Sequence, residues 1–363
     1  MLFLLLVFNA QKYVQNITLQ TIIVVQKFMT IEERLAAFEK LGEYLYAIDG
    51  DDYDSLIDNV KNENPWFTPG SVNLALEGVR RYLDPSRMRK WVSRYQVSPA
   101  TAKQIAVIMA GNIPLAGFHD FLCVLISGHS IMMKLSSKDS VLPTFVAEKL
   151  VEIEPRFQPK ISMPARLKNF DAVIATGSDN SSRYFNYYFG KYPNIIRKNR
   201  TSCAVLTGFE TEEDLRLLGR DVFTYFGLGC RNVSKIFIPG EFDPVKLVRA
   251  WDIYIDIIHH NKYHNNYEYQ KSILLVNKIP FYDSGFVILH ENTKLVSPIS
   301  VVYLERYKDR DDLTAKLGMV SDKIQCVVGN TEPQHIPFGQ AQAPELWDYA
   351  DRIDTLGFLQ ALT

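Results

Sequence analysis

The sequence has few cysteines and no excess of charge of either sign. Its 363 residues hold four cysteines, and 40 Lys and Arg against 41 Asp and Glu give a formal net charge of −1. The cysteines form no CxxC pair, so the sequence predicts neither a structural zinc site nor a disulfide framework. Free thiols are typical of a reducing compartment, and we expect a cytoplasmic protein. The balanced charge argues against a nucleic-acid partner, which requires a basic surface.

The sequence also lacks a run of about 20 apolar residues, the length that a membrane-spanning helix needs. Residues 1–7 are apolar, but polar residues soon follow and no basic residue precedes them. Met29 stands before Thr30, a predicted N-cap that Glu33 would complete as a capping box. We therefore predict that residues 1–28 are a non-native or disordered extension and that the chain has no stable membrane span. A weak signal peptide or membrane anchor is the alternative.

Three of the seven histidines lie close together, at positions 259, 260 and 264. His259, His260 and His264 are surrounded by polar residues, which favours an exposed polar surface over a set of metal ligands. The sequence therefore predicts no metal site.

Short apolar runs alternate with helical segments between residues 104 and 189. The expected strands are 104–110, 130–135 and 170–175, and the expected helices are 115–127, 140–153 and 181–189. This alternation predicts a parallel α/β sheet, in which ligands bind beyond the carboxyl ends of the strands. Asn112, Lys134 to Ser137, and Thr176 to Ser178 follow such strand ends.

Helical periodicity precedes this sheet and a second α/β segment follows it. Residues 30–95 are expected to be helical, with Ser71 capping the helix that follows a loop at residues 64–70. In the second segment the expected strands are 203–206, 234–238, 272–276, 285–289 and 301–304, and the expected helix is 214–226. We predict domains at 29–200 and 201–335, followed by a C-terminal tail at 336–363.

Cys230 is the cysteine with the strongest chemical signal. It follows Gly229 and precedes Arg231. Glycine lets a substrate approach the backbone closely, and a neighbouring cation lowers the pKa of a thiol. The alternative is a small buried core residue. The other three cysteines lie in apolar runs and are predicted to be core residues.

Four segments in order resemble the aldehyde dehydrogenase superfamily. Asn112-Ile-Pro114 resembles its Asn-x-Pro turn, and Gly128 to Lys134 resembles its segment ending in lysine. Thr176-Gly-Ser178 resembles its Thr-Gly-Ser turn, and Gly229-Cys230 resembles its nucleophile segment. Within the superfamily the chain is most similar to the LuxC-type acyl-CoA reductases, from about residue 60 to its tail.

This resemblance implies an aldehyde-dehydrogenase-like α/β fold and a role for each motif residue. Cys230 would attack an acyl-CoA thioester, and Asn112 would stabilise the oxyanion. The cofactor would contact Lys134, Ser136, Ser137, Thr176, Gly177 and Ser178. Residues 29–200 would then be the nicotinamide-cofactor domain, and residues 201–335 the catalytic domain. For Asn112, Lys134 and the Thr176–Ser178 turn the alternatives are a turn residue, a solvated lysine and a helix cap.

The chain departs from the family pattern in three places. Hydrolytic members carry a glutamate base where this chain has Arg197 to Ser202 with no carboxylate, which favours acyl-CoA reduction over acid formation. The basic side chains of this stretch would either attract CoA phosphates or, as we favour, form a solvated loop. Ser137 stands where NAD-preferring members have glutamate, which favours NADPH, with NADH as the alternative. Leu295 to Pro298 replaces the motif that holds the nicotinamide ribose, so no ribose-binding carboxylate is assigned.

The predicted function is therefore reduction of an acyl-CoA thioester, expected to be fatty, to an aldehyde. One alternative is a cysteine acyltransferase or thioesterase, which needs a histidine such as His264 or His290 near Cys230. Another is a non-catalytic relative of the same fold. The resemblance also implies a homo-oligomer and leaves room for a partner protein that donates acyl groups.

Overall fold

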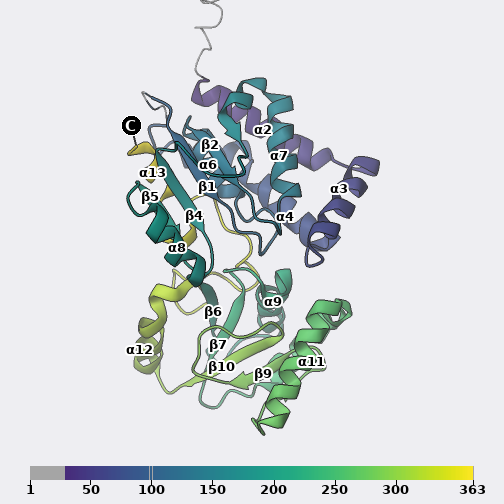
Figure 1. The fold of residues 1–363 in the computed structure, drawn as a ribbon. Helices are drawn as coiled ribbons and strands as arrows, with labels where there is room; N and C mark the ends of the chain where they lie inside the picture. The colour runs from purple at the N-terminus through teal and green to yellow at the C-terminus, as the bar shows by residue number, and fades with distance from the viewer. Residues whose placement is uncertain (1–28, 98, 100, 363) are drawn as a thin grey trace, which may run out of the picture.

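The computed structural model describes residues 29–97, 99 and 101–362, so the prediction for residues 1–28 lies outside the described residues. Two β-sheets follow one another along the chain, each flanked by helices, and Figure 1 shows them one above the other. The expected α/β architecture is confirmed. No helix in the described ranges is long and apolar enough to cross a membrane.

Four helices precede the first sheet: α2 (Ile31–Ala47), α3 (Gly50–Glu63), α4 (Pro69–Tyr82) and α5 (Pro85–Val92). The capping box of α2 is confirmed, because the Glu33 backbone N–H donates to the Thr30 hydroxyl and the Thr30 N–H donates to the Glu33 carboxylate. The prediction that Ser71 caps α4 is wrong. Thr68 is the N-cap and accepts from the Ser71 backbone N–H at 3.2 Å, because Pro69 already occupies the first helical position.

The first sheet has five parallel strands in the order β3-β2-β1-β4-β5. The strands are β1 (Gln104–Ile108), β2 (Ser130–Lys134), β3 (Ile161–Ser162), β4 (Ala172–Thr176) and β5 (Asn194–Arg197). The helices between them are α6 (Phe118–Ile126), α7 (Val141–Ile153), η1 (Pro155–Lys160) and α8 (Asp179–Phe189). The order reverses at β1, so that loops after β1 and β4 diverge and leave room for a ligand.

The second sheet has six strands in the order β11-β6-β7-β10-β9-β8, all parallel except the edge strand β8. The strands are β6 (Thr201–Val205), β7 (Val233–Pro239), β8 (Tyr282–Asp283), β9 (Ile288–Glu291), β10 (Val301–Tyr307) and β11 (Ile324–Val328). The helices are α9 (Glu212–Phe223), η2 (Thr224–Gly227), α10 (Val245–Ala250), η3 (Asp252–His259), α11 (Asn261–Val276), α12 (Arg310–Val320) and η4 (Ser321–Lys323).

The strand expected at residues 272–276 is wrong, because this apolar run is the last turn of α11. His260 caps this helix by accepting from the Tyr263 backbone N–H. Leu275 and Val276 are 58% and 81% exposed, so the run is not core-forming. A capped helix therefore overrides the local strand pattern.

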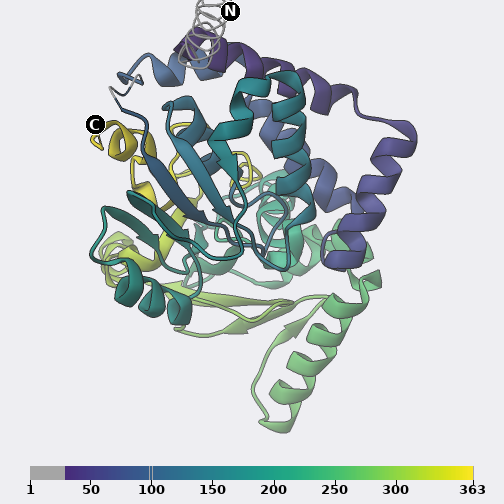
Figure 2. The same cartoon turned by 45° about the horizontal axis from the view of Figure 1, so that its top comes forward.

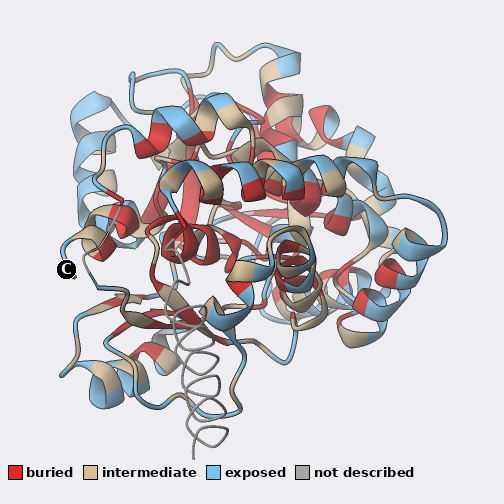
Figure 3. Ribbon diagram, turned by 90° about the horizontal axis from the view of Figure 1, so that it is seen from above, coloured by how far each residue is buried: buried red, intermediate tan, exposed pale blue. Residues whose placement is uncertain are grey.

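The C-terminal tail joins the two cores. Phe338 and Ala341 pack in the core of the second sheet, and Leu346 and Leu356 pack in the core of the first. The tail forms η5 (Ala350–Arg352) and α13 (Thr355–Gln360). Figure 2 shows the yellow tail beside both sheets, and Figure 3 shows buried residues on the strands and on the helix faces turned toward them.

Candidate active site

The predicted site residues of the first sheet lie at one edge. Asn112 follows β1, Lys134 ends β2, and Thr176 ends β4. Because β1 pairs in parallel with both β2 and β4, the carboxyl ends of these three strands are neighbours. The structure therefore brings together the motifs that the sequence places far apart.

Cys230 lies in the turn before β7 of the second sheet, and its residue is half-buried. The turn is fixed by Asn232, whose Oδ1 accepts from the Gly229 backbone N–H at 2.8 Å. A Cβ on Gly229 would lie 2.7 Å from this oxygen, so the turn requires glycine. Ser202 Oγ donates to the Cys230 carbonyl oxygen at 3.0 Å. The backbone that carries the thiol is thus held from two sides.

Asn112 connects the first sheet to the Cys230 turn. Its Nδ2 donates to the carbonyl oxygen of Leu228 at 2.7 Å. The side-chain amide has two N–H groups, so one is left for an oxyanion. Asn112 therefore lies beside the cysteine turn, as the motif order predicts.

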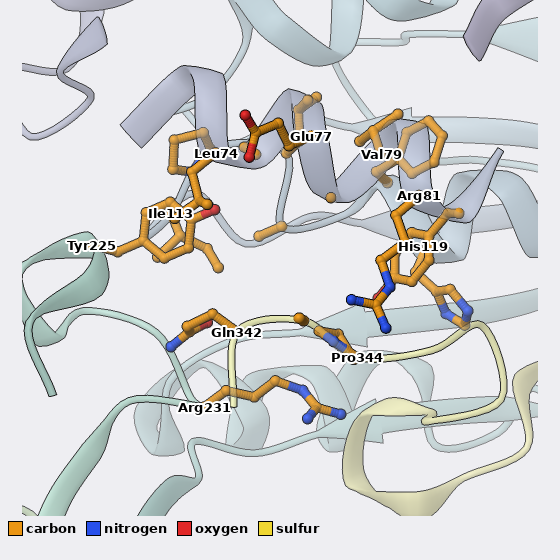
Figure 4. Close-up of a pocket in the computed structure, with 18 of the residues that line it drawn as sticks. Leu74, Glu77, Val79, Arg81, Ile113, His119, Tyr225, Arg231, Gln342 and Pro344 are labelled. Carbon is orange, nitrogen blue, oxygen red and sulfur yellow. The ribbon is translucent and has the colours of Figure 1, made fainter. Parts of the chain in front are cut away.

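A cavity of about 320 Å³ opens at Cys230. Figure 4 shows Leu74, Glu77 and Val79 of α4 on one side and Arg231 and the tail on the other. Further apolar lining residues are Ala75, Gly78, Ile113, Pro114, Leu115, Phe118, Gly339 and Ala343, and the polar ones include Arg81, His119, Arg220, Tyr225, Gln325, Gln342 and Asp348. The cavity therefore places a largely apolar wall next to a thiol.

Burial raises the pKa of the Cys230 thiol, and the Arg231 charge lowers it without cancelling that effect. The expected effect of Arg231 on the thiol pKa is therefore present, but burial outweighs it and the pKa of Cys230 is raised overall. Arg231 also donates to the carbonyl oxygens of Ala341 and Asp348, at 3.4 and 3.2 Å. It holds the tail against the cysteine turn.

The stretch from Arg197 to Ser202 is a solvated loop only in its middle, where Lys198 and Asn199 are exposed, and the expectation is corrected for Arg197 and Arg200. Arg197 is buried and forms an ion pair with Asp120 of α6 at 2.6 Å. Arg200 pairs with Asp351 of the tail at 3.2 Å. Sequence reasoning missed both acids, because they lie far away in the chain. Asp120 lies inside the otherwise apolar run of α6, and this was the one local indication that a buried cation pairs with it.

The predicted cofactor contacts are engaged within the protein. Lys134 Nζ donates to the Ala165 carbonyl oxygen at 2.8 Å. Ser178 is the N-cap of α8, and its hydroxyl accepts from the Ser181 N–H at 3.2 Å. These are the structural roles that we weighed as alternatives, and they leave contact with a cofactor as a prediction.

The same applies to the residues next to these. Thr176 Oγ1 accepts from Arg197 at 3.3 Å. Ser136 Oγ accepts from the Lys138 N–H at 3.2 Å, while Ser137 is exposed. Gly177 is packed closely, since a Cβ there would lie 2.8 Å from the Phe185 ring and 2.9 Å from Ser181.

A cationic groove of about 890 Å³ runs beside α8, and we call it the α8 groove. Its cations are Arg183, Lys198, Arg200, Lys294 and Lys323, and its acids are Asp322 and Asp351. In the part of the chain that the structure describes, Lys198, Lys294 and Lys323 have no acidic partner within 4 Å. The backbone of Lys294 is held by a hydrogen bond, because the buried Lys235 Nζ donates to the Lys294 carbonyl oxygen at 3.2 Å.

The histidines named for an acyltransferase do not reach Cys230. His264 and His290 are not among the residues that line its cavity. His119 lines the cavity, but its ring nitrogens contact the Leu346 carbonyl oxygen at 2.9 Å and Cys123 Sγ at 3.8 Å. Among the described residues, therefore, no histidine is placed as a base for this thiol.

Comparisons with known proteins identify a family match and a fold. Residues 69–241 match the family model described as acyl-CoA reductase (LuxC), a region that includes Asn112 and Cys230. A search of curated proteins gave no match.

Solved aldehyde dehydrogenases have the same fold. The enzyme from Mycobacterium tuberculosis, complexed with NAD+, is 14% identical with a TM-score of 0.60, over 86% of this chain and 76% of that chain. A cysteine-to-alanine mutant of aldehyde dehydrogenase C from Pseudomonas syringae, complexed with NAD+ and octanal, is 12% identical with a TM-score of 0.60. That match covers 84% of this chain and 73% of the other. An NADP-dependent enzyme of E. coli is 11% identical with a TM-score of 0.62, over 86% and 76% of the two chains.

The chain has the aldehyde dehydrogenase fold. The resemblance to LuxC-type acyl-CoA reductases is confirmed over residues 69–241, and the fold and this match together support an oxidoreductase that acts on aldehyde or acyl groups.

Proposed function

We propose that the protein reduces an acyl-CoA thioester to an aldehyde, with Cys230 as the nucleophile and a reduced nicotinamide as the hydride donor. The observation that carries the proposal is the half-buried Cys230 thiol at an apolar cavity, next to Asn112 on the opposite sheet. The match to acyl-CoA reductases covers both residues and supports the same chemistry.

The α8 groove fits a cofactor that carries phosphates. Three of its lysines have no acidic partner within 4 Å among the described residues, and its walls are fixed by buried ion pairs. The groove adjoins α8, whose N-cap Ser178 belongs to the predicted cofactor turn, but none of the six predicted cofactor residues lines the groove itself. NADPH carries a third phosphate, and the excess of cations supports it over NADH. When bound, this cofactor supplies the hydride that lowers the acyl group to the aldehyde level.

Each residue of the chain then has a defined task. The Cys230 thiolate attacks the thioester carbonyl and forms a C–S bond, and the bond to CoA sulfur breaks. Asn112 donates its second N–H to the carbonyl oxygen as negative charge develops there, a contribution of about 10²–10³ in rate. The Cys230 thiol gives up its proton before the attack, and the departing CoA thiolate takes up a proton in its place. When the aldehyde leaves, the C–S bond to Cys230 breaks, and the charge of Arg231 stabilises the released thiolate.

Asp351 lies beside the stretch where hydrolytic aldehyde dehydrogenases carry their glutamate base. It is engaged by Arg200 at 3.2 Å, and burial raises its pKa. A carboxylate held in an ion pair is poorly placed to activate water. The arrangement therefore favours an acyl-enzyme that is reduced rather than hydrolysed.

The test uses purified protein with a panel of acyl-CoAs, NADPH and NADH, read as loss of nicotinamide absorbance. We expect acyl-CoA-dependent oxidation, faster with NADPH, and a fall of at least about 1,000-fold in Cys230→Ala. Cys203→Ala, a buried cysteine of β6 outside the cavity, is the matched control and should stay active.

Mass spectrometry of protein incubated with acyl-CoA alone should find the acyl group on Cys230. An acylated Cys230 without any NAD(P)H oxidation would instead indicate an acyltransferase. Full activity in Cys230→Ala would refute the proposal.

A further inference from the structure

A second cavity opens from the Cys230 cavity on the side of the tail. It measures about 760 Å³, and we call it the arginine cleft after Arg94, Arg231 and Arg352, which line it. Arg231, Gln325 and Asp348 line both cavities, so the two are continuous beside the thiol. By contrast, the α8 groove shares no lining residue with the Cys230 cavity.

The 3-10 turn η5 separates these three spaces. Its consecutive residues Ala350, Asp351 and Arg352 line the Cys230 cavity, the α8 groove and the arginine cleft, respectively. Asp351 and Arg352 both have left-handed backbones, with φ of 56° and 59°. Such strain in two adjacent non-glycine residues is typical of functional sites. Here it turns the Arg352 side chain away from the ion pair of its neighbour and into the cleft.

The cleft has cations available for a ligand. Within the described ranges, neither Arg94 nor Arg352 has an acidic partner within 4 Å. The carboxylates of the cleft serve as helix or turn caps: Asp354 accepts from the Gly357 N–H and the Tyr95 hydroxyl, and Asp348 accepts from the Glu345 N–H.

An aromatic ring lies among these cations. Trp347 lines the cleft, and the Arg94 guanidinium lies 5.7 Å and Lys90 Nζ 4.5 Å from its ring centroid. Tyr95 and Tyr349 line the same wall, and their hydroxyl oxygens are 2.9 Å apart. Planar rings beside guanidinium groups suit a ligand that combines a flat base with phosphates.

We propose that the arginine cleft binds the phosphorylated nucleotide of CoA, while the acyl chain lies along α4 in the Cys230 cavity. The inference rests on the proposed function, in which the thioester of an acyl-CoA lies at Cys230. The acyl chain and the phosphorylated nucleotide must then extend from the thioester in different directions. The apolar wall matches the acyl half, and the cationic cleft matches the phosphates. Arg231, at the junction of the two cavities, lies next to the thioester.

CoA and NADPH both carry a phosphorylated adenosine, so the experiment must show which of the two the arginine cleft binds. Arg94→Glu and Arg352→Glu reverse the charge of the cleft. Arg216→Glu is the control, because Arg216 is an arginine of α9 outside the three cavities, with a side chain 41% exposed that pairs with Glu212 and Glu213. KM is measured for acyl-CoA, for the corresponding acyl-pantetheine, which has no nucleotide, and for NADPH. Calorimetry measures binding of free CoA to the same proteins.

Each cleft variant should raise KM for acyl-CoA roughly tenfold, with kcat, KM for NADPH and KM for acyl-pantetheine unchanged. Binding of free CoA should weaken by the same factor, and Arg216→Glu should match the wild type. An equal KM rise for acyl-pantetheine, a rise for NADPH alone, or unchanged CoA binding would overturn the proposal. If the wild type shows no reductase activity but its CoA binding weakens in the cleft variants, the proposed function fails and the CoA site stands.

Discussion

At the scale of single residues, the site depends on positions that the sequence alone does not single out. Cys230 and Asn112 could be predicted because their motifs are local and occur in order. The cavity wall could not, because Gly78, Gly339 and Ala350 meet there only after folding. Gly78 is the clearest case, since a Cβ built on it has no atom within 4 Å.

Gly78→Leu should shorten the acyl chain that the enzyme prefers. The new side chain would project into open space in the cavity, while a helical glycine is replaced by a better helix former, so we expect a folded protein. We predict that kcat/KM for the longest accepted acyl-CoA falls about tenfold or more, with shorter chains little affected.

The control for this substitution is Gly318→Leu, at a helical glycine of α12 with an equally open Cβ position outside the cavity. It should leave the chain-length profile unchanged. A uniform loss of activity across all chain lengths in Gly78→Leu would contradict the role given to Gly78.

At the scale of elements, the alternation of strands and helices in residues 104–189 was predictable, because each strand is a buried apolar run between polar turns. The shortest strands, β3 and β8, carry too few residues for a pattern. The edge strand β5 was missed because its four residues end in Arg197. That arginine is buried only because Asp120 of α6 neutralises it, and a pairing of this kind is set by tertiary structure.

Asp120→Ala should therefore strongly destabilise the first sheet. It leaves the buried Arg197 guanidinium without its counter-ion, which costs about 3–5 kcal/mol of unfolding free energy. The double variant Asp120→Leu, Arg197→Met should recover most of this loss, since it removes both charges.

Urea unfolding measures both variants. Glu152→Ala, which breaks the exposed ion pair with Lys149, is the control and should cost less than about 1 kcal/mol. A double variant as unstable as Asp120→Ala would show that the arginine is needed for more than neutralisation.

At the scale of the whole molecule, the tail is the segment that makes two sheets into one site. Asp221, fully buried on α9, accepts from the backbone N–H groups of Gly339 and Ala341 at 2.6 and 2.9 Å. This carboxylate fixes the tail as it crosses from the second core to the first. The sequence placed a C-terminal tail at residues 336–363, but a contact between residues 221 and 339 is too distant in the chain to predict.

Burial raises the pKa of Asp221 to about 6 from 3.8. Between these values the folded protein holds a proton that the unfolded chain has lost, so stability falls as the pH rises from about 4 to 6. The loss amounts to at most roughly 3 kcal/mol. Asp221→Asn should remove this contribution and lower stability at pH 4 by about 1–3 kcal/mol, because the amide can accept from only one of the two N–H groups.

Urea unfolding of wild type and Asp221→Asn at several pH values tests this, with Asp51→Asn on the exposed face of α3 as the control. The difference between wild type and Asp221→Asn should shrink as the pH rises from 4 to 6. A difference that is constant with pH would rule out Asp221 as the titrating group.

The position of η5 at the meeting point of three cavities also bears on biosynthesis. The residues from Gly339 to Arg352, which close the walls of these cavities, are synthesised after every strand of both sheets. Until then a nascent chain has a thiol but no enclosed place for an acyl group or a nucleotide. If Cys230 is the nucleophile that we propose, we therefore expect it to accept an acyl group only after the tail has been added.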